Sequence, residues 1–175
     1  MSQAGALNNT GGGGGGTGAL QQVRVQDSSF NQTSNPMPLN NTIPTTAQGA
    51  QLFSATITPQ LATSILLIEC TINIVGSAFN GVKYILQGTQ IALFRDAGVN
   101  AISTNISDGL VSQLSMTFFV SSVSKNPTTF ALRYGTLLTS LGTPVCFVNG
   151  GISALGGGIE FSSMLITEYA TWHFH

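Results

Sequence analysis

The last five residues of the chain, "TWHFH", hold both of its histidines, His173 and His175. Residues two apart on an extended segment point to the same side, so the two imidazoles would lie together. Three copies around a threefold axis would bring six imidazoles to that axis, a ligand set that suits octahedral Fe, Zn or Ni. The alternative is a frayed terminus with two solvated histidines.

Side-chain catalysis finds little support in the sequence. A serine triad needs a histidine that an acid holds in place, and a histidine at the chain terminus is poorly placed for that role. Asp96 has the setting of a turn residue, whereas Glu69 and Glu168 lie in apolar segments, where a structural hydrogen-bonding role is expected. A glycosidase needs two carboxylates about 5–10 Å apart, an alternative that substitutions of Asp96 and Asp108 would test. We expect that the protein is not an enzyme.

The chain carries very little charge. Only 6% of its residues are charged, and the formal net charge is −1, whereas about 25% is typical of globular domains. The five basic residues are widely spaced, which argues against nucleic-acid binding, because duplex binding needs several phosphate contacts. A monomer with so few charges is poorly protected against self-association. We therefore expect partners to cover much of the surface, as in a symmetric oligomer or a larger assembly.

Cysteine usage and hydropathy indicate the cellular compartment in which the protein is expected to assemble. Cys70 follows the apolar run "ILLIE" and is expected to be a buried small hydrophobe, while a disulfide with Cys146 stays open. The beginning of the chain, "MSQAGALNN", lacks the charged and apolar regions of a secretory signal. The longest apolar runs are too short to cross a bilayer. We expect no membrane insertion, and assembly in a cytoplasm.

The organisation of the chain changes near residue 45. Residues 1–45 include six consecutive glycines and, apart from a short strand expected at 19–26, no sustained hydrophobic period. The glycine run is not followed by the Lys-Ser/Thr of a phosphate-binding loop. We predict that 1–45 is an extended arm that becomes ordered against another protein, with a flexible linker as the alternative.

From residue 46 to residue 170 the pattern has period two. Phe53, Ala55 and Ile57, for example, alternate with polar residues, as in a half-buried strand. No period of 3.6 is present, and the abundant Thr, Val, Ile and Phe favour strands. About eight short strands predict an antiparallel β-sandwich or jelly roll, followed by a tail at 171–175. The expected strand segments are 51–59, 64–78, 84–97, 110–123, 128–138, 144–151 and 162–170.

Several segments carry a family resemblance. They are "TIPTTAQGAQLFSATITPQLATSILLIE", "IALFRDAGVNAIS", "TTFALRYG", and "VNGG" followed by "ALGGGIEFSSMLITEYA". In this order and spacing they resemble small β-sandwich domains at the C-termini of tailed-phage virion proteins, particularly tail fibres and other appendages. The resemblance covers about residues 42–170. Two departures are the lack of a long shaft or coiled coil and the additional "TWHFH".

The resemblance implies a jelly-roll-like homotrimer in a phage virion, made and assembled in the host cytoplasm and involved in host attachment. Residues 1–45 would then dock onto other virion proteins. In the last crossing of the sandwich, Ile159, Phe161, Met164 and Ile166 would pack into the domain or a subunit interface. Two alternatives stay open: a capsid decoration or head-fibre protein, and a non-viral lectin-like or tumour-necrosis-factor-like trimeric module.

Host attachment makes a surface glycan a candidate partner. Weakly charged loops rich in Asn, Ser and Thr can hydrogen-bond sugars, and 96–109 and 149–158 are expected to be such loops. Within the first, Asn105 and Asp108 are the candidate contacts. A recessed pocket containing Asn105, Asp108 or Tyr134 would support this hypothesis.

Overall fold

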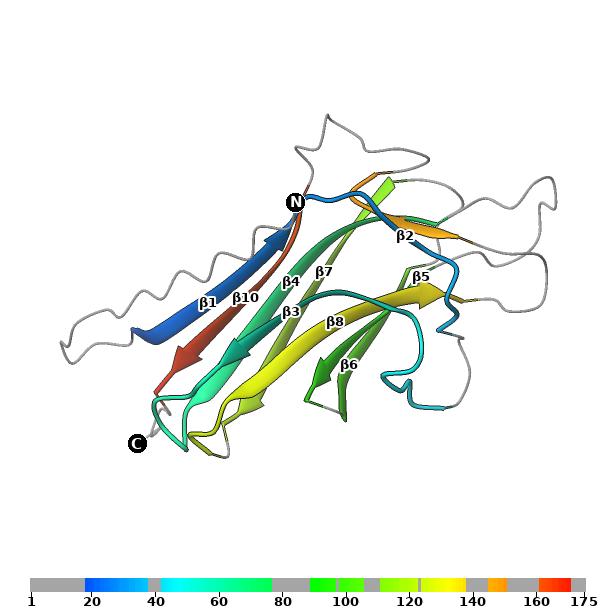
Figure 1. The fold of residues 1–175 in the computed structure, drawn as a ribbon. Coiled ribbons are helices and arrows are strands. Elements are labelled where there is room, and N and C mark those ends of the chain that lie inside the picture. The colour runs from blue at the N-terminus through cyan, green and yellow to red at the C-terminus, as the bar shows by residue number, and fades with distance from the viewer. Residues whose placement is uncertain are drawn as a thin grey trace, which may run out of the picture.

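The computed structural model describes residues 18–37, 42–76, 89–96, 98–105, 111–122, 124–137, 145–150 and 161–170. In this part of the chain the regular elements are ten strands, with no helix (Figure 1). No helix in it is long and apolar enough to cross a membrane. The strands are β1 (Ala19–Asp27), β2 (Asn31–Thr33), β3 (Ala50–Ile57), β4 (Ile65–Gly76), β5 (Thr89–Arg95), β6 (Gly98–Asn105), β7 (Val111–Ser121), β8 (Thr128–Thr136), β9 (Cys146–Val148) and β10 (Ser162–Tyr169).

The strands form two antiparallel sheets that lie face to face (Figure 1). The six-stranded sheet has the order β1-β10-β4-β9-β2, with β7 on the other side of β4. The four-stranded sheet has the order β3-β8-β5-β6. The long β4 makes the first sheet possible, because its beginning pairs with β10 and its end with β9, while β7 follows its opposite edge.

The strand pairing is that of a jelly roll. Leaving out the short β2 and β9, the strands β1, β3, β4 and β5 pair antiparallel with β10, β8, β7 and β6 respectively. The chain is therefore one long antiparallel hairpin that is rolled over into two sheets. This confirms the predicted all-β sandwich, with β2 and β9 as an additional short pair.

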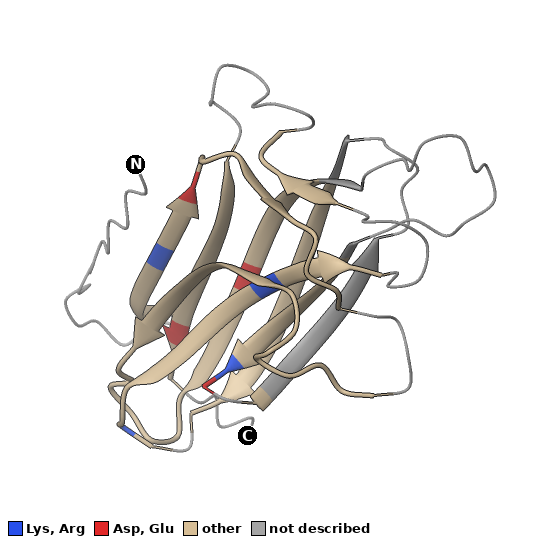
Figure 2. Ribbon diagram, turned by 45° about the vertical axis from the view of Figure 1, so that its right-hand side comes forward, with Lys and Arg blue, Asp and Glu red and all other residues tan. Residues whose placement is uncertain are grey.

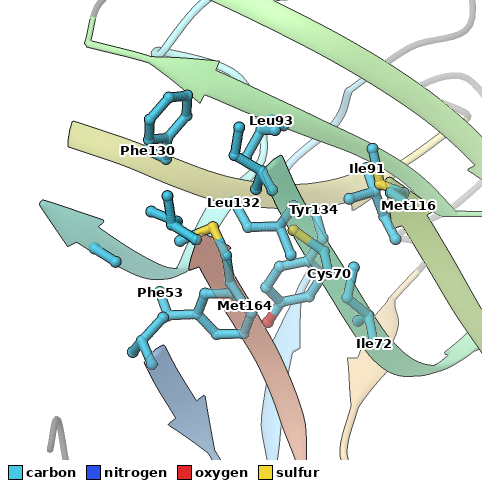
Figure 3. Close-up of a cluster of buried hydrophobic side chains, with 14 of the residues drawn as sticks. Phe53, Cys70, Ile72, Ile91, Leu93, Met116, Phe130, Leu132, Tyr134 and Met164 are labelled. Atoms are coloured by element: carbon cyan, nitrogen blue, oxygen red, sulfur yellow. The ribbon is translucent and has the colours of Figure 1, made fainter. Parts of the chain in front are cut away.

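The predicted alternation of side chains is confirmed in β3 and β4. Phe53, Ala55 and Ile57 are buried, and so are alternate residues of β4 from Leu66 to Ile74. The inner faces of both sheets supply the core, and Figure 3 shows side chains of the two sheets pointing toward one another. Complete burial of each large aliphatic or aromatic side chain contributes about 1.5–3 kcal/mol to folding. Cys70 lies among these residues, as predicted for a small hydrophobe.

The sandwich begins earlier in the chain than residue 46. β1 pairs with β10 along its length, and Val23 and Val25 belong to the main core. β2 pairs with β9, where Phe30 stacks on Phe147. The predicted arm thus contributes two strands to the larger sheet, whereas 1–17 lie outside the described residues, as does the tail 171–175.

The segment after β2 crosses the outer side of the smaller sheet. Met37 is completely buried there against a second apolar cluster of Ala92, Phe94 and Ala131. The Met37 amide donates to the Thr136 carbonyl at 2.9 Å. This close approach requires glycine at residue 135, because a Cβ there would lie 2.8 Å from the Met37 Cβ. The crossing ties the N-terminal part of the chain to both sheets.

The closing segment was predicted to pack into the domain or a subunit interface, and the structure confirms packing into the domain for two of its residues. Met164 and Ile166 are completely buried in the core, but Phe161 is 41% exposed. Phe161 precedes β10, and its exposure excludes it from the domain core. Ile159 and the three glycines at 156–158 lie outside the described residues.

Candidate interaction surface

Of the four predicted site residues, Asn105 lies in the described part of the chain. Asn105 is the last residue of β6, where its backbone pairs with Thr89. The segment 96–109, expected to be a loop, therefore contains a strand, because the chain turns sharply at Asp96 and returns along β5. Asp108, His173 and His175 lie outside the described residues. Among the described residues, no group of three His, Cys, Asp or Glu could hold a metal ion.

Tyr134 is a core residue rather than part of a recessed binding pocket. Its side chain is only 2% exposed, in the middle of the main apolar cluster (Figure 3). Burial raises the pKa of its phenol above the ordinary value, which keeps the hydroxyl neutral. Tyr134 therefore does not supply the recessed pocket that would support glycan binding.

The second predicted glycan loop begins in a structural network. Asn149 has a φ of 57° and is 1% exposed. Its Nδ2 donates to the carbonyl oxygens of Asp27 at 2.8 Å and Ser29 at 3.1 Å, while its Oδ1 accepts from the Ser162 hydroxyl at 2.8 Å. These bonds join the end of β1, the β1–β2 connection and the beginning of β10 to the residue that follows β9, and they leave the buried Asn149 side chain no free polar face for a sugar. Residues 151–160 lie outside the described part of the chain.

Asp96 is a turn residue, as predicted. It has a φ of 53°, a left-handed conformation that Asp tolerates better than most residues. Its Oδ1 accepts from the Thr129 amide at 3.0 Å, and its own amide donates to the Thr129 carbonyl at 2.8 Å. Both bonds hold the β5–β6 turn against β8, which is a structural role.

Glu168 also has the predicted structural role. Its completely buried carboxylate accepts hydrogen bonds from the β3–β4 connection and from β1. Burial by itself raises the pKa of this carboxyl, but the hydrogen bonds outweigh that effect and hold the pKa below its ordinary value near 4.5. The donors are Ser64, Gln60, Gln21 and Leu61. A carboxylate satisfied in this way is not poised to transfer protons.

The two thiols are unsuited to nucleophilic chemistry. Burial raises the pKa of the Cys70 thiol to about 12, which suppresses the reactive thiolate. The thiol of Cys146 is also buried and donates to the Thr33 carbonyl at 3.6 Å. No disulfide joins the two residues.

A surface that sequence reasoning did not identify lies on the larger sheet. We call the outward side of β1, β10, β4 and β7 the outer face. One row of residues in register across it is Arg24, Leu165, Glu69 and Thr117. The next row is Gln22, Thr167, Leu67 and Phe119, of which Thr167 is buried.

The outer face combines an exposed aromatic ring with very little charge. Phe119 is 71% exposed, the highest value among the exposed aromatic residues of the described chain. Among the described residues of the four strands, Arg24 and Glu69 are the exposed charges, since Asp27 and Glu168 are buried. Figure 2 shows how thinly charged residues are scattered over both sheets. The alternation of β7 carried a weak signal for this surface, because Phe119 continues the row of Gln113, Ser115 and Thr117.

Comparisons with known proteins give distant likenesses. No family model and no curated protein matches the chain. The C-terminal domain of EclA, a sugar-binding protein, is 15% identical with a TM-score of 0.37, covering 77% of this chain and 76% of that one. The VP2 subviral particle of infectious bursal disease virus is 11% identical with a TM-score of 0.38, covering 86% of this chain and 37% of that one. Dimeric latent PorU from Porphyromonas gingivalis is 11% identical with a TM-score of 0.36, covering 90% and 14%.

Proposed function

We propose that this chain is a structural virion protein of a tailed bacteriophage, a homotrimeric tail-fibre or appendage protein that takes part in host attachment. The observation that carries the proposal is a jelly roll with only 6% charged residues and an exposed sheet face that bears Phe119. A jelly roll serves capsid and lectin proteins alike, so the fold is compatible with both particle assembly and binding.

The low charge favours a protein that works within an assembly over one that works as a free monomer. Soluble monomers depend on net charge and on dispersed surface charges to resist association. Here, by contrast, the polar side chains of the outer face are mostly the neutral groups of Ser, Thr and Gln. Such a surface costs less to desolvate than a charged one when a neighbour covers it, because no strong ionic hydration is lost.

The proposed contact with other virion proteins lies at the beginning of the chain. Since β1 and β2 belong to the sandwich, the segment left for docking is 1–17 rather than 1–45. Its glycine-rich backbone suits β-strand addition, in which main-chain hydrogen bonds supply the affinity. Docking onto a tail makes the protein an appendage, and docking onto a capsid makes it a decoration or head-fibre protein.

Gold-labelled antibodies against the purified protein test this proposal on phage particles released from bacteria that carry its gene. Label on the tails is the expected result. Label on the heads would favour the decoration protein, and particles without label would contradict a virion role. Asp108 and Asn105 stay the proposed glycan contacts, which an array of host-surface glycans tests by loss of binding in Asp108→Ala.

The terminal histidines stay a proposed ligand set for Fe, Zn or Ni. His173 and His175 of three copies would meet on the trimer axis and join the subunits. Metal analysis of the purified oligomer, before and after substitution of both histidines by alanine, tests this directly. A metal-free oligomer would overturn the metal site and leave the virion role unaffected.

A further inference from the structure

We propose that the outer face of β1, β10, β4 and β7 is the contact surface between copies of this chain, with Arg24 of one copy beside Glu69 of the next. This inference rests on the self-association in the proposed function and adds where the copies meet. Neither the resemblance nor the likenesses in fold assign this face.

The two charges stand on opposite halves of the outer face. Arg24 is an exposed residue of β1 and Glu69 an exposed residue of β4, and both are in register with Leu165 of the intervening β10. With neighbouring strands about 4.8 Å apart, their Cα atoms are separated by about 10 Å. Among the described residues, neither side chain forms an ion pair. Each charge therefore lacks an ionic partner within the described part of its own copy.

An apolar strip follows the charged row. Phe119 is 71% exposed, and its cross-strand neighbour Leu67 is half-buried, as are Ile65 and Leu165 on the same side of the sheet. Phe119 lies on β7, the strand at one edge of the outer face, and aromatic residues are enriched in protein–protein interfaces. The polar residues around it are mostly Ser, Thr and Gln, which suit a rim that keeps some water.

The arrangement of charge favours a second copy as the occupant. The face bears one positive and one negative charge, so a strongly acidic or basic partner gains little from it. A second copy can pair with both charges. When the β1 half of one face meets the β4 half of the next, Arg24 approaches Glu69. Three faces turned toward a threefold axis repeat this contact around a closed ring.

The size of the face fits such a contact. Four strands of 8–12 residues, spaced about 4.8 Å apart, cover roughly 600 Å² in projection. The relief of the side chains raises the accessible area above that figure. A stable interface takes about 800 Å² from each partner. In the ring each face is divided between two neighbours, so the area that one copy buries in its two contacts together, rather than in one contact, is of this order.

Charge-swap variants of the full-length chain test the proposal by sedimentation analysis over a range of concentrations. Arg24→Glu and Glu69→Arg each place like charges together and are expected to weaken self-association at least about tenfold. The double variant restores opposite charges and is expected to return within about threefold of the original dissociation constant. Lys125→Glu, an exposed charge reversal outside the four strands, is the control and should leave assembly unchanged.

Phe119→Ser provides a second test that does not depend on charge. Loss of the exposed ring is expected to weaken association at least about tenfold. Ile43→Ser is its control, since Ile43 is 75% exposed and lies outside the four strands. Thermal unfolding at a concentration where the chain is monomeric should be the same for both variants and the original protein.

The outcomes separate this inference from the proposed function. Assembly that is lost in the single swaps and regained in the double swap supports the face as the subunit contact. Assembly unaffected by the single swaps and by Phe119→Ser overturns the face but leaves self-association standing. Swaps that lower the unfolding temperature of the monomer without changing its association indicate pairing within one copy and overturn the inference. An original protein that is monomeric throughout overturns both the inference and the assembly in the proposed function.

Discussion

Glu168 stabilises the sandwich as a charged group. Its carboxylate holds the β3–β4 connection through the amides of Gln60, at 2.9 and 3.0 Å, and Leu61, at 3.1 Å. An amide side chain in its place would bring an NH₂ group against donors. We expect Glu168→Gln to lower the free energy of unfolding by about 2 kcal/mol near neutral pH, as measured by urea unfolding. The exposed Lys125→Gln, which lies outside the four strands of the outer face, is the control, with a change of less than about 0.5 kcal/mol.

The same carboxylate predicts a pH dependence. Because the folded-state pKa of Glu168 is lower than its unfolded value, its contribution is complete above the ordinary pKa near 4.5. That contribution is lost as the pH falls through the folded-state pKa. The stability difference between the original protein and Glu168→Gln should therefore shrink in urea unfolding below about pH 4.5. A difference that is constant from neutral to acidic pH would contradict the assigned role.

Gly135 is a residue whose identity is dictated by close packing. An added Cβ would lie 2.8 Å from both the Asn35 oxygen and the Met37 Cβ. Gly135→Ala should therefore destabilise the protein by about 1–3 kcal/mol in thermal unfolding. Gly98→Ala is the matched control, since the nearest atom to its added Cβ is 3.8 Å away. Equal effects of the two substitutions would show that the crossing segment does not pack closely on β8.

Among the elements, β1 is the one for which the structure and the predicted arm differ, and substitutions in it test whether it is a strand of the sandwich. Val25 is buried in the core and Gln26, its neighbour, is exposed. Val25→Ser should lower the free energy of unfolding by about 2 kcal/mol, because it loses apolar burial and leaves a gap. Gln26→Ser should change it by less than about 0.5 kcal/mol. If neither substitution changed the free energy of unfolding measured in urea, β1 would not be part of the cooperative fold.

Strands with a clear alternation could be predicted from the sequence, and strands defined by their partners could not. The inward faces of β3 and β4 follow directly from period two. β6, "GVNAISTN", has few apolar residues, and the turn at Asp96 together with its pairing to β5 makes it a strand. β1 was foreseen as a short strand, but its partner β10 lies at the other end of the chain, and sequence separation hides such a pairing.

The candidate surface was even harder to predict from the sequence. Arg24, Leu165 and Glu69 become neighbours only through the register of three strands. The exposure of Phe119 depends on which side of β7 meets the core, and apolar residues occur on both sides of that strand. The strand within the expected loop 96–109 was missed for the same reason, because the pairing of β6 with β5 is not visible in the sequence.

For the whole molecule, self-association is the property that connects the low charge with the exposed face. A chain with a formal net charge of −1 and 6% charged residues has little electrostatic protection for its surface. The jelly roll leaves the outer face of its larger sheet with Phe119 exposed. Both features have the same explanation if neighbouring copies cover that face in the working particle.

The most direct measurement is the absolute mass of the purified full-length protein by light scattering across a range of concentrations. For the proposed homotrimer, we expect a stable species near three times the chain mass of 18.2 kDa. The same measurement on Arg24→Glu should give a lower mass at equal concentration. A species of 18.2 kDa at every concentration would contradict the central claim, because the exposed, weakly charged face would then have no copy to cover it.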